Sequence, residues 1–98
     1  MMINEQDKKI IIAYARKLDI KEIYLFGSLL ENESEAKDID LAIKGASPIQ
    51  FFDFYGKLLR YLSKPVDVIN LSKKSKFTDM IEKQAVKIYG KAHPGNLY

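Results

Sequence analysis

The sequence contains no cysteine and one histidine, His93, and both facts exclude common kinds of site. Without cysteine the chain can form neither a disulfide framework nor a thiolate metal site. One histidine near the end of the chain excludes a histidine-rich zinc site and a histidine-based triad. No apolar run approaches the roughly 20 residues of a membrane span, and residues 1–9 lack the apolar core of a signal peptide. We therefore expect a cytoplasmic protein without membrane contact.

Length and composition predict one domain over residues 1–98. Of the 98 residues, 47% are hydrophobic and 30% are charged, which is enough for one modest core. The net charge is +3, from 16 basic and 13 acidic residues scattered along the sequence. A charge this small weakly permits anionic partners, and we do not expect direct nucleic-acid binding.

The first half of the chain predicts a helix, two strands and a polar loop. Residues 4–18 carry apolar side chains at helical spacing, with Asn4 as a cap. Residues 22–26 predict a short buried strand, and the acidic residues 29–36 predict a loop or one helical turn. Residues 38–43 alternate, which predicts a strand with Ile39, Leu41 and Ile43 on one face and Asp38, Asp40 and Ala42 on the other.

The second half predicts a helix, a strand and a last helix. Ser47-Pro48 with Gln50 is a strong helix start, and this helix should run to about residue 62 with an inner stripe of Phe51, Phe54, Tyr55, Leu58 and Leu62. Residues 66–71 predict a strand. Residues 76–89 predict a helix with an inner face of Phe77, Ile81, Ala85 and Ile88, and residues 91–98 a loose tail. The fold class is therefore α/β or α+β, a small mixed sheet of three to four strands covered by helices, with its core in residues 5–90.

Two carboxylates on one strand face suggest metal binding. Asp38 and Asp40 stand about 6.5–7 Å apart along the strand and point the same way. An alternative is ordinary alternation on a half-exposed strand. Two observations weaken that alternative: Asp is depleted in strands, and two like charges on one face repel unless a cation lies between them. Hard oxygen ligands select Mg²⁺ or Mn²⁺.

Two further features stand near this pair in the sequence. Gly27-Ser28 follows the first strand, where glycine lets a ligand approach the backbone and serine offers a hydroxyl and an N–H group. Asp67 lies inside the apolar run 66–71, where a carboxylate needs a metal, a cation or hydrogen-bond donors. Taken singly, each feature has a simpler explanation: Gly27-Ser28 as a plain turn that ends the strand, and Asp67 as one half of a structural salt bridge with a lysine. Taken jointly and in this order, they predict metal-assisted phosphoryl or nucleotidyl transfer.

With these residues in place, the chain resembles the minimal nucleotidyltransferase (MNT) domains of the DNA polymerase β-like superfamily. The matching motif is Gly27-Ser28, nine residues, Asp38-Ile39-Asp40, and a later strand aspartate, Asp67. The resemblance covers residues 5 to 90 and implies the polymerase β-like palm fold. It also implies roles: Gly27 and Ser28 would bind the outer phosphates of ATP, and Asp38 and Asp40 would bind Mg²⁺ or Mn²⁺. Asp67 would orient or deprotonate the acceptor hydroxyl and share a metal ion.

The resemblance further implies an antitoxin. Small MNT proteins commonly pair with a helical HEPN ribonuclease toxin, and some transfer AMP from ATP to a toxin tyrosine. We therefore expect a homo- or hetero-oligomer. Two alternatives remain: an antitoxin that blocks its partner by binding alone, and a nucleotidyltransferase acting on a small molecule.

The spacer departs from the usual family pattern. Leu29 and Leu30 stand where many relatives carry an arginine, and Lys37 stands where they carry a serine. Three glutamates, Glu31, Glu33 and Glu35, would repel a triphosphate. Lys37 and Lys44 flank the Asp strand and either offset those charges or are plain surface lysines. We hypothesise that a partner supplies cationic groups to the triphosphate.

Overall fold

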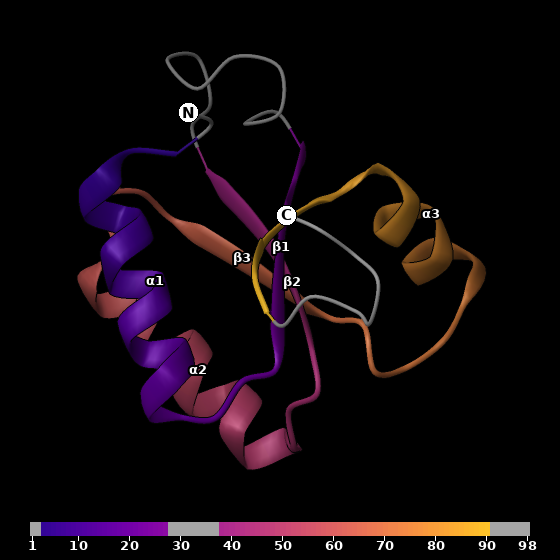
Figure 1. The fold of residues 1–98 in the computed structure, drawn as a ribbon, viewed down its shortest axis with the longest axis horizontal. Coiled ribbons are helices and arrows are strands. Elements are labelled where there is room, and N and C mark those ends of the chain that lie inside the picture. Colours follow the sequence, from indigo (N-terminus) through magenta and orange to yellow (C-terminus); the bar gives the residue numbers. More distant parts are fainter. Residues whose placement is uncertain (1–2, 28–37, 91–98) are drawn as a thin grey trace.

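The computed structural model describes residues 3–27 and 38–90. Over these ranges the chain forms three helices and four strands, shown in Figure 1. In chain order they are α1 (Glu5–Lys17), β1 (Glu22–Phe26), β2 (Ile39–Lys44), α2 (Pro48–Tyr61), β3 (Val66–Asn70), α3 (Lys76–Gln84) and β4 (Val86–Tyr89). The first five agree with the predicted elements to within one or two residues. The expected tail, 91–98, and the expected acidic loop, 29–36, lie outside the described residues.

The helices begin where side-chain oxygens can accept from the free N–H groups of the first turn. The Asn4 side chain accepts from the Asp7 backbone N–H at 2.8 Å, as the sequence predicts. Ser47 and Gln50 form the predicted capping box at the start of α2, and Ser75 with Thr78 forms another at α3. None of the helices in the described ranges is both long and apolar enough to cross a membrane.

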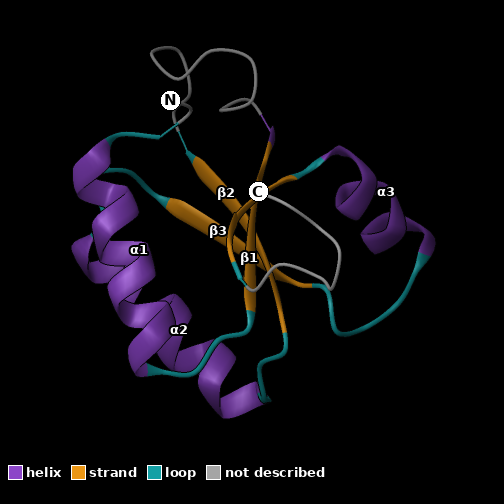
Figure 2. Cartoon of the chain, in the orientation of Figure 1, coloured by secondary structure: helices purple, strands orange, loops and turns teal. Residues whose placement is uncertain are grey.

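The four strands form one mixed sheet in the order β3-β2-β1-β4. β1 pairs antiparallel with both β2 and β4, whereas β2 and β3 run parallel and are joined by α2. Figure 2 shows α1 and α2 together on one side of the sheet and α3 on the other. The expected class, a small mixed sheet covered by helices, is confirmed.

Most of the core lies between the sheet and the helices α1 and α2. The predicted inner residues of β2 are buried there together with β1, β3 and the stripe of α2; fully buried members are Ile23, Leu25, Ile39, Leu41, Ile43, Phe54 and Leu58. A smaller cluster of Ala42, Leu71 and Ile81 lies under α3 on the opposite face. Along that face of β2, exposure rises from buried Ala42 to half-buried Asp40 and exposed Asp38. One end of the second face is therefore open to solvent.

The prediction of a last helix over residues 76–89 is wrong in its second half. α3 ends at Gln84, Ala85 is extended, and Val86–Tyr89 form strand β4. β-Branched and aromatic side chains suit a strand, and the free edge of β1 offers a ladder in which Ile23 pairs with Tyr89. The residues expected on one inner face are therefore divided between two clusters. Ile81 of α3 belongs to the smaller cluster with Ala42 and Leu71, whereas Ile88 of β4 packs against the main core. Phe77, expected inside, is 53% exposed.

Asp7 joins the start of α1 to the chain after α2. It is 2% exposed, and its carboxylate accepts from the Ser63 backbone N–H at 3.1 Å and from the Ser63 hydroxyl at 2.5 Å. The Asn4 side-chain amide also donates to it, at 3.1 Å. Because a buried charge is stable only with such donors, this carboxylate fixes α1 against the segment that leads into β3.

Replacing Asp7 with Ala should lower the free energy of unfolding by about 2–3 kcal/mol, because the Ser63 donors lose their acceptor. Urea unfolding followed by circular dichroism measures this. Asp53→Ala is the control, since Asp53 pairs with Lys57 at the surface of α2 and such a pair contributes at most about 1 kcal/mol. Equal losses in the two variants would contradict the role given to Asp7.

Candidate functional site

The parallel register of β2 and β3 brings two carboxylates side by side. Asp40 pairs directly with Asp67, so the two side chains point to the same face of strands that lie about 4.8 Å apart. Asp38 precedes Asp40 by two residues and belongs to the same face. The register thus pairs Asp40 with Asp67, and Asp38 lies two residues before Asp40 on the open end of the same face.

Asp67 lies in an apolar strand, yet its side chain is exposed, because it stands on the open part of the second face. The alternative of a structural salt bridge is not found: neither Asp40 nor Asp67 takes part in an ion pair within the described residues. The three acids are therefore left to repel one another.

Asp40 carries the electrostatic effect of this arrangement. Burial raises the pKa of Asp40 above its usual value, and the charges of Asp67 and then Asp38 raise it further. A bound cation would offset the charges of Asp67 and Asp38 and so remove their contribution to the raised pKa of Asp40. The donor set of the site is thus suited to a cation.

Gly27 lies directly against Asp40. It follows Phe26, the residue of β1 paired with Asp40, and has a φ of 82°. A β-carbon at Gly27 would overlap the Asp40 Oδ2 atom. Both the backbone angle and the close approach therefore require glycine here. Ser28, the second half of the predicted phosphate-binding turn, lies outside the described residues, so its role stays a prediction.

Tyr55 is a site residue that sequence reasoning placed in the core stripe of α2 and did not assign to the site. Its hydroxyl donates to Asp67 Oδ1 at 3.1 Å. Burial raises the pKa of Tyr55, and the hydrogen bond to Asp67 and the charge of Asp67 raise it further, against a smaller lowering by the Val68 backbone. The one available signal was a hydroxyl in an otherwise apolar stripe, which needs a polar partner.

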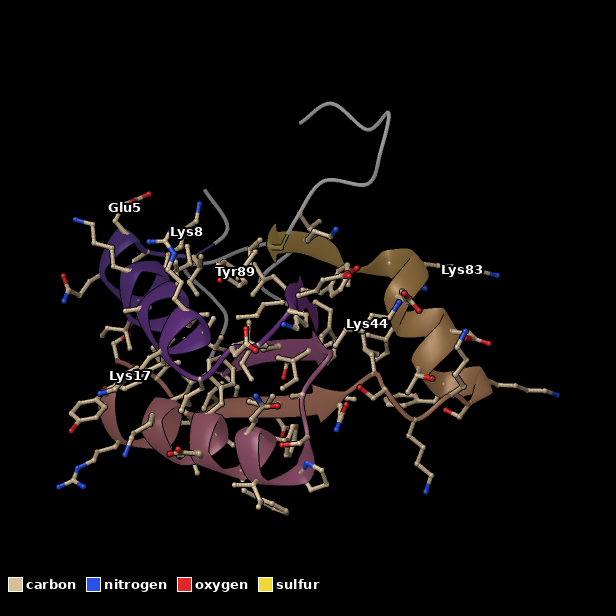
Figure 3. All side chains as sticks on the ribbon, turned by 60° about the horizontal axis from the view of Figure 1, so that its bottom comes forward. Glu5, Lys8, Lys17, Lys44, Lys83 and Tyr89 are labelled. Carbon is tan, nitrogen blue, oxygen red and sulfur yellow. The ribbon has the colours of Figure 1, made fainter. Side chains whose placement is uncertain are left out.

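Lys44 does not belong to the site. It ends β2 at the opposite end from Asp38, and its ammonium group pairs with Glu82 of α3. Figure 3 shows the labelled Lys44 beside α3. The expectation that Lys44 offsets charge near the phosphates is therefore not supported. Lys37, Glu31, Glu33 and Glu35 lie outside the described residues.

The carboxylates fit Mg²⁺ or Mn²⁺ as part of a coordination shell. Within residues 3–27 and 38–90, no three acidic or histidine side chains are arranged as a complete metal site. Mg²⁺ does not need one, because it commonly takes one or two protein carboxylates and fills its octahedron with substrate phosphates and water. One or two of the carboxylates of Asp38, Asp40 and Asp67 could supply the protein ligands of such an ion.

Comparison with known proteins identifies the family. The model of the family described as polymerase beta, nucleotidyltransferase matches residues 8–94, and the chain belongs to this family. No curated protein matches the sequence.

Three solved structures have the same fold. A toxin-antitoxin with AMP-PNP is 26% identical, with a TM-score of 0.69 over 86% of this chain and 73% of that chain. A tri-AMPylated Shewanella oneidensis HEPN toxin in complex with MNT antitoxin is 25% identical, with a TM-score of 0.66 over 93% of this chain and 74% of that chain. The toxin-antitoxin MntA-HepT, at 24% identity and a TM-score of 0.66 over 90% and 74% of the two chains, is similar in fold. The expected MNT-type fold is confirmed.

Replacing Gly27 with Ala should lower the free energy of unfolding by about 1–2 kcal/mol from the backbone angle alone, with a further loss from the overlap with Asp40. Gly56→Ala is the matched control, because a β-carbon at Gly56 in α2 would meet nothing within 4 Å. That variant should gain about 0.5–1 kcal/mol, since alanine favours the helix. Urea titration of both proteins measures the difference, and a gain in both would contradict the close approach.

Replacing Asp40 with Asn should stabilise the metal-free protein at pH 7. Since the pKa of Asp40 is raised above 3.8 in the folded state, ionised Asp40 lowers the free energy of unfolding as the pH rises above 3.8. The gain should be under about 1 kcal/mol, because solvent screens a half-buried group. It should disappear at pH 3, where wild-type Asp40 is protonated in both states. Urea titrations in EDTA at pH 3 and 7 measure this; Asp53→Asn, which breaks a pair with Lys57, should give no gain.

Proposed function

We propose that the protein is a metal-dependent nucleotidyltransferase that moves AMP from ATP to a hydroxyl group on a protein partner. The observation that carries this proposal is the register pairing of Asp40 with Asp67. Asp38 stands two residues before Asp40 and adds a third carboxylate near the pair. Family membership supports the reaction type. The partner we propose is a HEPN toxin, which makes the protein its antitoxin and places it in the cytoplasm with ATP.

Two relatives at 25% identity or above support the nucleotide and the partner. One is described as a toxin-antitoxin with AMP-PNP, an analogue of ATP. The other is a tri-AMPylated HEPN toxin in complex with MNT antitoxin. Both have the fold of this chain over most of its length, and AMP on a toxin is the product that the proposed reaction would leave.

Each site residue has a defined task in this proposal. Asp38 and Asp40, with Asp67, would hold Mg²⁺ or Mn²⁺, which supplies neutralisation of phosphate charge when bound. Gly27 and Ser28 would bind the outer phosphates through backbone N–H groups and the serine hydroxyl.

Asp67 would orient the acceptor hydroxyl and take its proton. The acceptor oxygen then forms a bond to the α-phosphorus, the bond from that phosphorus to the bridging oxygen breaks, and pyrophosphate leaves. Positioning and charge stabilisation supply most of the acceleration in such a transfer.

Exposed apolar side chains support a protein as the acceptor. On α2, Ile49 is 82% exposed and Phe52 is 72% exposed, with Leu59 also exposed. On α3, Phe77 and Met80 are exposed as well. On each helix these residues stand three or seven positions apart, so they share a helix face, and the two helices lie on opposite sides of the sheet (Figure 2). Exposed apolar faces of this kind are typical of surfaces that bind another protein.

A second candidate is an antitoxin that neutralises its partner by binding alone. The observation that favours it is the spacer after Gly27, where three glutamates stand and no arginine is present. The exposed apolar side chains fit this candidate equally well. A transferase acting on a small molecule is the third candidate, and no particular observation favours it.

Incubation with the proposed HEPN partner, ATP and Mg²⁺ should add AMP to that partner, measured by intact mass spectrometry. The double variant Asp38→Asn, Asp40→Asn should abolish the addition, because the metal ligands lose their charge. Asp19→Asn, at the surface beside Lys21, is the control and should act like wild type. Toxin neutralised without any mass gain, equally by wild type and the double variant, would instead establish the second candidate.

A further inference from the structure

The hydrogen bond between Tyr55 and Asp67 uses one of the two oxygens of the proposed acceptor-binding carboxylate. Tyr55 donates to Oδ1. Within the described residues, Oδ2 accepts no hydrogen bond, so it is the oxygen left for a ligand. A carboxylate that is held by one oxygen and free at the other is a common arrangement where a second group orients a ligand.

The strand pairing shows from which side Tyr55 approaches. Ile39 N–H donates to Pro65 C=O and Leu71 N–H donates to Ile43 C=O, each at 2.8 Å. Odd-numbered residues of β3, which include Asp67, therefore direct their backbone groups toward β2, and even-numbered residues direct theirs to the open edge.

Tyr55 reaches Asp67 from α2, which packs against β3 at the end of the strand order. Its hydroxyl therefore lies on the edge side of Asp67, and Asp40 lies on the opposite side, one strand inward. A carboxylate whose Oδ1 is held toward the edge would have its Oδ2 on the side of Asp40. The bond that satisfies the tyrosine hydroxyl would then direct the other oxygen into the site.

We propose that Tyr55 is a positioning residue that acts through Asp67 and holds its Oδ2 toward Asp40, where a metal ion and the acceptor hydroxyl would bind. This inference rests on the proposed function. A purely structural tyrosine is the competing explanation, because the Tyr55 ring also packs edge-on against Phe51, with centroids 5.9 Å apart. The two explanations differ in whether the effect of the hydroxyl depends on Asp67.

The test is a double-mutant cycle on metal binding with Tyr55→Phe and Asp67→Asn. Tyr55→Phe keeps the ring and removes the hydroxyl, and Mn²⁺ alone is the probe, with the free ion counted by electron paramagnetic resonance. In the wild-type background Tyr55→Phe should weaken Mn²⁺ binding about tenfold, as loss of an orienting partner typically does. In the Asp67→Asn background it should weaken binding no further, since the residue through which it acts is already changed.

Tyr61→Phe on the same helix is the matched control, because it also removes one hydroxyl and keeps a ring that stacks on Tyr14 at 5.7 Å. It should leave Mn²⁺ binding unchanged, and both variants should unfold within a few degrees of wild type. In the transfer assay at saturating Mg²⁺, Tyr55→Phe should lower kcat about tenfold and leave the KM for ATP within about twofold, because the metal site is then filled and Gly27 and Ser28 are assigned to the phosphates.

Failure of this inference and failure of the proposed function give different results. Equal weakening by Tyr55→Phe in both backgrounds, or no weakening in either, would overturn the positioning role while wild-type transfer of AMP still stood. Wild-type protein that binds no Mn²⁺ would overturn the inference together with the metal site. A third result is also distinct. If wild type binds Mn²⁺ and the double-mutant cycle comes out as expected, but no AMP is transferred, the positioning role of Tyr55 stands and the proposed reaction is wrong.

Discussion

The repulsion between two neighbouring carboxylates is the constraint on which the structure of this protein depends. Asp40 and Asp67 are paired across β2 and β3, and neither is in an ion pair with a described residue. Such a pair is tolerable where water can screen it or a cation can join it. The fold meets the first condition by placing its main core on the opposite face of the sheet. α3 covers the second face over Ala42 and leaves the aspartate end open.

Two residues outside β2 and β3 position the side chains of Asp40 and Asp67, each in a different way. Gly27 acts through what it lacks, since its missing β-carbon leaves the space that Asp40 occupies. Tyr55 acts through a hydrogen bond to Asp67 from outside the sheet edge. One is a turn at the end of β1 and the other a helix position, so the site depends on the packing of three separate elements around β2.

Local signals in the sequence predicted most of the fold and the identity of the acids. The caps at Asn4 and Ser47 and the alternation of β2 are local, and they were confirmed. The segment after Gln84 was predicted wrongly because Ala85 and Ile88 also fit a helical face, and the deciding factor was the free edge of β1, which is distant in the sequence. The bond from Tyr55 to Asp67 was missed for the same reason: it depends on how α2 crosses the edge of β3, and no spacing encodes that.

The sheet order also has a consequence for aggregation. Asp40, Tyr55 and Asp67 belong to the continuous unit β2-α2-β3, and Asp38 directly precedes it, whereas the last strand, β4, pairs on the far side of β1. Without β4 the apolar strand β1 would present an unpaired edge, which is the kind of surface on which chains pair with one another. The strand that contributes no acid to the site therefore covers an edge that would otherwise favour aggregation.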